Sequence, residues 1–251
     1  MDSQYLSDKE RTRYDRHIKL PEVGEKGQRK LKAASALIVG MGGLGSASSL
    51  YLAAAGLGKI GIVDYDRVEL SNLQRQILHG EPRLGEMKVD SALQRINELN
   101  SEVVIERYPV EFTLENAPRL VRNYDVIIDG SDNFNARYIM NDVCVNEKKP
   151  YVYGAVYGFD GQASVFDARL GPCYRCLFPE NPAEKGEVLV KPGVLSPLPG
   201  IIGCIQAVEA IKLILGIGES LIGQLLVCSL IETRFLKISV RKRDHCDACG
   251  K

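Results

Sequence analysis

The sequence predicts a mixed α/β fold whose sheet is parallel in the N-terminal half of the chain and antiparallel in the C-terminal half. Over residues 35–150, short apolar runs alternate with segments of helical periodicity, the pattern of parallel strands joined by helices. Beyond Pro150 the pattern changes, because residues 151–157 and 162–167 flank a Phe-Asp-Gly turn of the kind that closes a β-hairpin. One mixed sheet covered by helices accounts for both halves.

The elements follow in order from the local patterns. Charged residues with helical spacing predict a helix over residues 7–19, and a second helix over 28–34 completes an N-terminal arm, residues 1–34. In the first half the expected strands are residues 36–39, 59–63, 103–108 and 124–129, and the expected helices are 44–55, 88–100, 116–121 and 135–146. In the second half, residues 151–251, we expect a proline-rich functional excursion over 178–199, a helix over 201–215 and two last strands over 223–229 and 233–240.

Length and composition indicate one folded domain spanning residues 1–251. The chain has 251 residues and is 45% hydrophobic, which is enough for a sizeable core. Lys plus Arg equals Asp plus Glu at 32 each, so no net charge gathers nucleic acid, and we do not expect it as a partner. The N-terminus is polar and polar residues interrupt the apolar stretch 201–215, so we expect a cytoplasmic protein with no membrane partner.

A glycine-rich segment follows the first predicted strand and opens a helix. In Gly40-Met-Gly42-Gly43-Leu-Gly45 the glycines let backbone amides approach a phosphate, and the helix N-terminus adds a favourable dipole. Asp64 ends the next strand, where its carboxylate can accept hydrogen bonds from ribose hydroxyls. Residues 35–150 are therefore predicted to be a Rossmann-like nucleotide-binding half, against the alternative of a tight glycine turn without a ligand.

The residues that follow distinguish a triphosphate from a dinucleotide. An NAD dehydrogenase shares the glycine loop, but a set of acidic, amide and cationic side chains after it suits a nucleoside triphosphate with a metal ion. The set is Asp66, Asn72, Arg75, Gln76 and Lys88. Further on, Asp132 and Asn133 follow a buried strand at the sheet edge where α/β folds bind ligands, and Asp132 is a candidate ligand of Mg²⁺.

Four of the seven cysteines form two pairs, Cys173 with Cys176 and Cys246 with Cys249. Four thiolates complete a tetrahedral site, and zinc in a structural role is the expected occupant, with redox chemistry and an iron–sulfur cluster as the alternatives. Cys144, Cys204 and Cys228 lie in apolar contexts and are expected to be buried, although Cys204 falls near a helix start that could favour its thiolate.

The histidines are expected to take no part in the chemistry. His17 and His79 have neighbours typical of a surface, and His245 is interpreted as a bystander of the cysteine site. We therefore assign no general acid or base.

These segments together resemble the ThiF, MoeB and HesA family of activating enzymes, which are related to the adenylation domain of ubiquitin-activating enzymes. The resemblance covers nearly the whole chain. Its motifs are Arg13-Tyr-Asp-Arg16-His17, the Gly40–Gly45 loop, Asp64-Tyr-Asp66, Ser71-Asn72-Leu-Gln-Arg75-Gln76, Lys88, Asp132-Asn133, Arg137 and both cysteine pairs.

The resemblance implies an enzyme that uses ATP to adenylate the C-terminal glycine carboxylate of a ubiquitin-like sulfur-carrier protein with a Gly-Gly end, releasing pyrophosphate. It implies that Asp64 binds the ribose and that Asp132 places Mg²⁺. The triphosphate is then held by Asn72, Arg75 and Lys88. Arg16 is implied to reach the phosphates of the partner subunit in a homodimer, and residues 151–251 to carry the carrier-binding and zinc functions.

Relatives of the ThiF type carry a reactive cysteine in the loop after the first cysteine pair, but residues 177–196 contain none, and Leu189 stands where it is expected. No sulfur-transfer domain is present up to Lys251, so we expect an external sulfur donor. Alternatives that stay open are a relative that activates a tRNA base or a peptide, and a non-catalytic binding module. Whether the pathway makes molybdopterin, thiamine, a thiolated tRNA or another product is also open.

Overall fold

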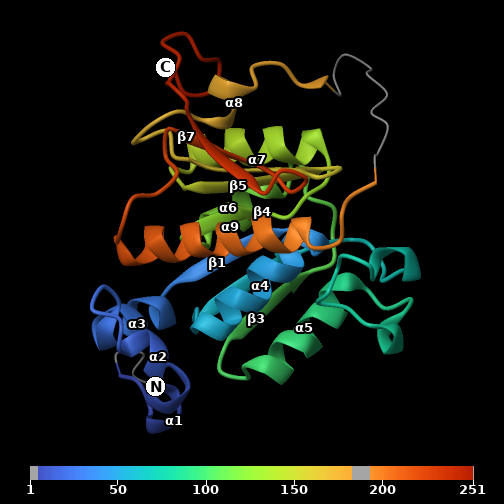
Figure 1. The fold of residues 1–251 in the computed structure, drawn as a ribbon, viewed down its shortest axis with the longest axis vertical. Coiled ribbons are helices and arrows are strands. Elements are labelled where there is room, and N and C mark those ends of the chain that lie inside the picture. The colour runs from blue at the N-terminus through green and yellow to red at the C-terminus, as the bar shows by residue number, and fades with distance from the viewer. Residues whose placement is uncertain (1–4, 183–192, 251) are drawn as a thin grey trace.

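A computed structural model describes residues 5–182 and 193–250, and its centre is one sheet of eight strands (Figure 1). The strand order is β3-β2-β1-β4-β5-β6-β7-β8. Pairing is parallel from β3 to β5 and antiparallel from β5 to β8, so the predicted change of direction is confirmed. The strands are β1 (Ser35–Val39), β2 (Lys59–Val63), β3 (Val104–Tyr108), β4 (Val126–Asp129), β5 (Tyr151–Tyr157), β6 (Asp160–Phe166), β7 (Gln224–Ser229) and β8 (Arg234–Ser239).

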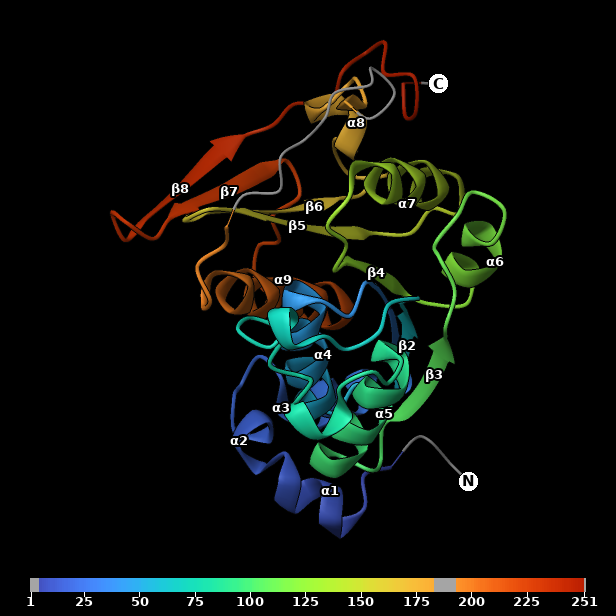
Figure 2. The same ribbon diagram turned by 90° about the vertical axis from the view of Figure 1, so that its right-hand side faces the viewer.

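Helices cover both faces of the sheet, with α4, α5 and α9 on one face and α6 and α7 on the other (Figure 2). The α-helices are α1 (Asp8–Arg13), α2 (Asp15–Ile18), α3 (Gly24–Ala33), α4 (Gly43–Ala55), α5 (Lys88–Leu99), α6 (Ala117–Arg122), α7 (Phe134–Asn146), α8 (Tyr174–Leu177) and α9 (Leu198–Leu215). Two short 3₁₀ turns, η1 (Leu70–Asn72) and η2 (Glu81–Arg83), lie between β2 and α5.

The central strand β1 explains why the core has two halves. Successive side chains of a strand point to opposite faces. Ala36 and Ile38 therefore join the core under α4 and α9, while Leu37 and Val39 join the core under α6 and α7. Burial on both faces matches the continuous apolar run in the sequence.

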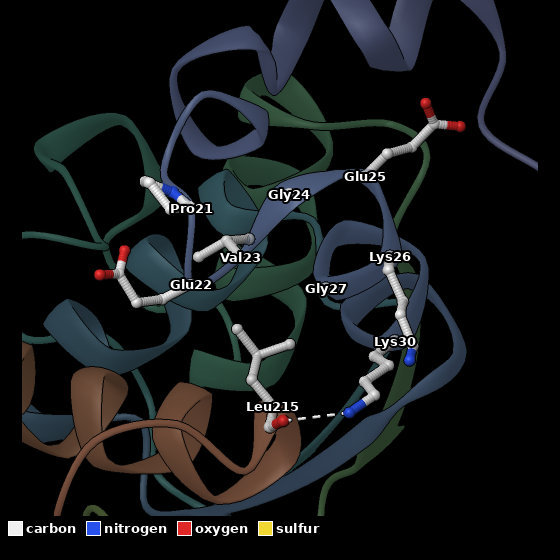
Figure 3. Close-up of a pocket in the computed structure, with 9 residues that line it drawn as sticks. All are labelled: Pro21, Glu22, Val23, Gly24, Glu25, Lys26, Gly27, Lys30 and Leu215. Atoms are coloured by element: carbon white, nitrogen blue, oxygen red, sulfur yellow. Dashed lines mark hydrogen bonds between the residues drawn. The ribbon is translucent and has the colours of Figure 1, made fainter.

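The N-terminal arm is helical as predicted, but its first helix breaks at Tyr14. The Tyr14 ring is buried against Gly56 at the end of α4, and its hydroxyl accepts a hydrogen bond of 2.8 Å from Asn100 at the end of α5. Anchoring this ring interrupts the helical periodicity. Figure 3 shows a second anchor, in which Lys30 Nζ donates to the carbonyl of Leu215 at the end of α9, beside a hollow of about 320 Å³.

Helix α9 begins at Leu198, three residues before its predicted start. It is long and apolar enough to cross a membrane by length and composition, but half of it is buried inside the fold. It packs on the sheet beside α4, and it approaches α4 closely because Gly203 has no side chain. We interpret it as a core helix.

The close packing of α4 on α9 gives a stability prediction. A Cβ atom at Gly203 would lie 2.5 Å from the carbonyl oxygen of Leu44, so Gly203→Ala should lower the free energy of unfolding by about 1–3 kcal/mol. Gly200, in the same helix, has open space around it, so Gly200→Ala should instead raise the free energy of unfolding by about 0.4–1 kcal/mol. Urea unfolding of both variants tests this, and equal effects would contradict it.

Candidate active site

The glycine loop turns between β1 and α4, and it touches the end of β4. Gly40 has φ +96°, a conformation that favours glycine. Its carbonyl oxygen is enclosed by two other glycines: a Cβ atom would lie 2.0 Å from this oxygen at Gly45 and 2.2 Å from it at Gly130. Each of the three positions therefore requires glycine, and the loops after β1 and β4 are held against each other.

Asp64 follows β2 and holds the glycine loop through its backbone. Its Oδ2 accepts a hydrogen bond of 2.7 Å from the Met41 amide, and its Oδ1 accepts one of 2.8 Å from the Asp66 amide. Burial raises the pKa of the Asp64 carboxyl, and the nearby Lys88 charge and the two amides oppose that rise. Each carboxylate oxygen keeps a further acceptor position, so Asp64 can bind a hydroxyl as well.

Lys88 is the first residue of α5, and only 4% of it is exposed. Its Nζ lies 2.9 Å from Asp66 Oδ2, and its amide donates to the Asp66 carbonyl at 2.9 Å. Asp66 itself is half exposed. The Lys88 ammonium group is therefore buried at this edge of the sheet, and its counterion Asp66 is accessible to solvent. Burial leaves the positive charge of Lys88 weakly screened.

The segment from Ser71 to Gln76 passes beside the glycine loop. A Cβ atom at Gly42 would lie 3.6 Å from Gln76 Nε2, and one at Gly43 would lie 3.4 Å from the Arg75 carbonyl oxygen. Gln76 Oε1 is buried and has no hydrogen-bond partner in the described part of the chain. Arg75 is half-buried and donates to the Ser71 carbonyl, and the Asn72 amide contacts Ser71 Oγ.

Asp132 and Asn133 lie between β4 and α7. Asp132 is exposed and follows the end of β4, and Asp66 follows the end of β2, which runs parallel to β4 in the same sheet. Asp132 thus faces the same edge as Asp66. The side chain of Asn133 caps α7 by accepting a hydrogen bond of 2.8 Å from the Ala136 amide. That structural role was not predicted.

A buried ion pair lies at the end of β4, next to this edge of the sheet. Asp129 ends β4, is fully buried, and accepts hydrogen bonds from Tyr151 and from both the amide and the hydroxyl of Ser131. Arg137 Nε lies 3.4 Å from Asp129 Oδ2 and has no hydrogen-bond partner in the described residues. Burial raises the pKa of the Asp129 carboxyl, and the Arg137 charge opposes the rise.

The expectation that His79 lies on the surface is wrong. Its ring is buried, with Nε2 at 2.9 Å from the Met41 carbonyl oxygen and Nδ1 at 2.8 Å from Ser91 Oγ. The polar neighbours in the sequence suggested exposure, but the chain folds back there onto the glycine loop. No periodic pattern surrounds His79 that could have revealed this contact.

Arg16 is the one predicted site residue that the structure keeps away from the rest of the set. It is exposed on α2, in the arm that packs at the end of α4 opposite the glycine loop. The 13 residues of α4 span about 20 Å at about 1.5 Å per residue. Within one chain Arg16 is therefore remote from the loop.

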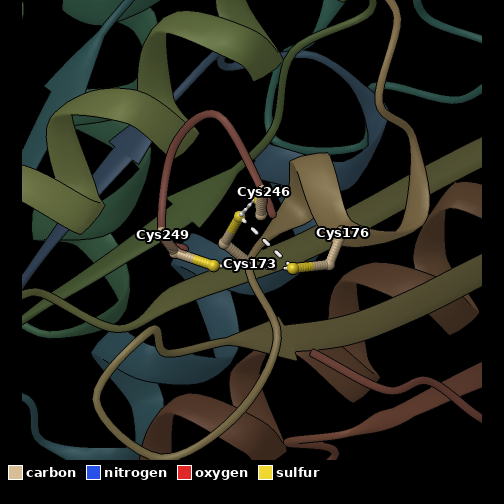
Figure 4. Close-up of side chains that lie close together, drawn as sticks. All are labelled: Cys173, Cys176, Cys246 and Cys249. Atoms are coloured by element: carbon tan, nitrogen blue, oxygen red, sulfur yellow. Dashed lines mark hydrogen bonds between the residues drawn. The ribbon is translucent and has the colours of Figure 1, made fainter. Parts of the chain in front are cut away.

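The four paired cysteines converge in one buried cluster (Figure 4). Their sulfur atoms all lie within 4.8 Å of one another, with separations of 3.9 Å for Cys173–Cys176 and 3.5 Å for Cys173–Cys246 and Cys176–Cys249. A tetrahedron of sulfurs about 2.3 Å from zinc has edges of about 3.8 Å. The cluster therefore has the size and the donor set of a four-thiolate metal site.

The other three cysteines lie outside this cluster. Cys144 and Cys228 are buried, as expected. Cys204 is half-buried, but α9 begins at Leu198, so Cys204 is a full turn beyond the residues that the helix dipole favours. Burial raises the pKa of the Cys204 thiol, which corrects the expectation of a stabilised thiolate.

A sequence model of the ThiF family matches residues 14–249. The chain is 47% identical to a sulfur carrier protein adenylyltransferase of Thermus thermophilus, covering 95% of this chain and 90% of that protein. It is also 47% identical to adenylyltransferase and sulfurtransferase MOCS3 of Culex quinquefasciatus, covering 98% of this chain and 56% of MOCS3, so it spans little more than half of that relative.

Among solved structures, a crystal structure of E. coli MccB with ATP matches with a TM-score of 0.84 at 25% identity, covering 100% of this chain and 77% of MccB. A crystal structure of PaaA matches with a TM-score of 0.81 at 25% identity, covering 97% of this chain and 77% of PaaA. Both have a fold similar to this one across nearly all of its length.

The buried ion pair gives a pH-dependent prediction. Arg137→Met leaves Asp129 buried without a counter-charge and should lower the free energy of unfolding by about 3–5 kcal/mol at neutral pH. The folded-state pKa of Asp129 then rises further above its unfolded value, so the folded variant holds a proton that the unfolded chain releases. The loss in free energy of unfolding therefore grows as pH rises through the folded pKa and shrinks at lower pH. Melting temperatures of variant and wild type from pH 5 to pH 8 should diverge as pH increases.

The control is Arg122→Met, which breaks an ion pair with Glu147 in which Arg122 is largely exposed. Its melting temperature should follow that of the wild type at every pH. A difference between Arg137→Met and wild type that is constant across the pH range would contradict the assignment.

Proposed function

The chain belongs to the ThiF family, and from that premise we propose that it is an adenylyltransferase that uses ATP to activate the C-terminal carboxylate of a ubiquitin-like sulfur-carrier protein. The observation that carries the proposal is the convergence of the glycine loop, Asp64 and Lys88 at the carboxyl edge of the parallel strands. A nucleotide bound there meets backbone donors, an acceptor for its ribose and a buried cation.

The reaction needs charge stabilisation more than a protein nucleophile. A carboxylate oxygen of the carrier attacks the α-phosphorus of ATP, and the bond from that phosphorus to the bridging oxygen of the leaving pyrophosphate breaks. The products are an acyl-adenylate and pyrophosphate. Negative charge grows on the phosphate oxygens during transfer, and fixed donors and cations in a partly desolvated site stabilise it.

Residues at the carboxyl edge of the parallel strands supply those donors and cations. The first amides of α4, from Gly43 onward, lack partners within the helix and bind phosphate oxygens. Lys88 and Arg75 neutralise the triphosphate, and Gln76 and Asn72 offer amide groups to it. Asp64 holds the ribose.

Asp132 fits a magnesium ligand, because its carboxylate is exposed at the same edge and Mg²⁺ takes one or two carboxylates beside phosphate oxygens. When bound, Mg²⁺ neutralises charge on the phosphates. Asn133 caps α7 and thereby helps to fix the β4–α7 turn that carries Asp132.

We assign Arg16 to the site of the partner subunit in a twofold homodimer. Its exposure and its distance from the loop of its own chain support that role, because the side chain is remote from its own phosphate site and accessible to another molecule.

The cysteine cluster is assigned to a structural zinc ion. The sulfur separations suit zinc, and the four ligands leave no open position for catalysis. The metal would bind residues 246–249 to the segment around α8, which fixes the C-terminal tail to the body of the domain.

Sulfur is assigned to an external donor. The site residues include no cysteine, and the half-buried Cys204 has a raised pKa. The part of the excursion at residues 183–192, where Leu189 falls, lies outside the described residues.

The function and the dimer are tested together by mixing inactive variants. Lys88→Ala and Arg16→Ala should each lose carrier-dependent exchange of labelled pyrophosphate into ATP. If Arg16 serves the partner's site, a dimer with one chain of each kind keeps one intact site, so a statistical mixture should recover about a quarter of wild-type exchange.

The matched control mixes Lys88→Ala with Arg75→Ala, two residues of the same site, and should recover nothing because every site then lacks one cation. Recovery in both mixtures or in neither would contradict the role of Arg16. A wild type that exchanges no pyrophosphate with any Gly-Gly carrier would contradict the function.

Metal analysis tests the cysteine assignment. Purified protein should contain about one zinc ion per chain. Cys249→Ser should lose most of the zinc and lower the melting temperature, whereas Cys204→Ser should keep the zinc because its thiol is outside the cluster. Zinc-free protein in which thiol titration finds two disulfides would contradict a metal site.

A further inference from the structure

His79 connects two elements of the nucleotide site, although it was not expected to contribute to it. It follows the Ser71–Gln76 segment and lies between the glycine loop and the first turn of α5. Its Nε2 is 2.9 Å from the carbonyl oxygen of Met41, and its Nδ1 is 2.8 Å from Ser91 Oγ. Ser91 lies three residues after Lys88, on the same side of the helix.

The partners of the ring fix its tautomer. A carbonyl oxygen can only accept, so Nε2 carries the hydrogen and donates it to Met41. In the neutral ring Nδ1 then accepts from the Ser91 hydroxyl. Burial lowers the pKa of His79 and outweighs the opposing effect of the hydrogen bond to Met41, and the charges of Lys88 and Arg83 lower the pKa further, which favours this neutral form.

The hydrogen bond to Met41 sets the orientation of the next amide. In a planar trans peptide the carbonyl of one residue and the amide hydrogen of the next point in opposite directions. Because His79 holds the Met41 carbonyl, the Gly42 amide hydrogen must point away from the imidazole. No hydrogen-bond acceptor for the Gly42 amide is recorded among residues 5–182 and 193–250.

The neighbouring groups of this segment are held as well. The Met41 amide donates to Asp64 Oδ2 at 2.7 Å, and the Gly42 carbonyl accepts from both the amide and the hydroxyl of Ser46, at 2.9 and 2.6 Å. A loop rich in glycine has more backbone freedom than any other sequence. Here Asp64, His79 and Ser46 together remove that freedom.

We propose that His79 is a positioning residue that presets the Gly42 amide to donate a hydrogen bond to a phosphate of the bound nucleotide. The inference rests on the proposed function, because it assumes that a nucleotide occupies the glycine loop. Preorganisation of the loop lowers the entropic cost of binding, so its loss weakens affinity without removing any direct contact.

Three substitutions at His79 distinguish the effect of the hydrogen-bond donor from the effect of the ring volume. His79→Gln places an amide nitrogen near the position of Nε2 and can still donate to Met41. His79→Leu has similar bulk and no donor. His79→Asn has a donor one methylene shorter, which reaches toward Ser91 but not toward Met41.

ATP binding by calorimetry is the primary measurement, at a temperature where each variant is folded by circular dichroism. His79→Leu and His79→Asn should raise the Kd for ATP by about tenfold, the effect of one lost hydrogen bond of ordinary strength. His79→Gln should stay within about threefold of wild type. If His79→Leu does not fold, the Kd values for ATP of His79→Gln and His79→Asn alone test the role of the donor.

The matched control for general destabilisation is Ile96→Ala, which truncates a buried side chain of α5 away from the loop. It should lower the melting temperature and leave the Kd for ATP unchanged. Equal affinities for wild type and His79→Leu, or equal weakening by Gln and Leu, would overturn the role of His79. Absence of ATP binding by the wild type would instead overturn the proposed function.

Discussion

The site depends on one close approach of backbone, at the carbonyl oxygen of Gly40. A side chain at Gly45 or at Gly130 would overlap that oxygen, so the helix α4, the end of β1 and the end of β4 meet with nothing between them. This contact brings the first turn of α4 within reach of the β4–α7 turn that carries Asp132. Without it, the phosphate donors and the predicted magnesium ligand would belong to separate surfaces.

The same helices connect this edge to the N-terminal arm. Helix α4 begins in the glycine loop and α5 begins at Lys88, while the arm binds the far ends of both: Gln28 donates to the Ala55 carbonyl and Arg13 to the Leu99 carbonyl, each at 2.8–2.9 Å. Cationic side chains at helix C-termini also complement the helix dipole. The arm that carries Arg16 is thus held by the elements that form the nucleotide site, which fixes the position of Arg16 relative to that site.

Sequence patterns predicted the mixed sheet and nearly all its elements, because apolar periodicity and turn chemistry are local signals. They also predicted the cysteine cluster, since four thiols in two pairs have few other uses. The position of His79, the break at Tyr14 and the capping by Asn133 were missed. His79 and Tyr14 find partners distant in sequence, which no local pattern records, whereas Asn133 caps a helix through an amide three residues ahead, a signal that the sequence does contain. Where Asp132 and Arg75 point is likewise a property of the fold.

The charges at the edge show why a stable fold and a prepared site are in conflict here. Lys88 is buried beside an exposed counterion, and burial raises the pKa of Asp64, so the site holds groups that water would solvate better. Gln76 and Arg137 add buried polar atoms without hydrogen bonds. The phosphates of a bound nucleotide supply acceptors and negative charge to Lys88, its ribose hydroxyls can donate to Asp64, and a ligand that binds only the folded state stabilises that state. Nucleotide binding would therefore relieve the cost of burying Lys88 and Asp64, which is the arrangement expected where binding energy is used to hold ATP for attack.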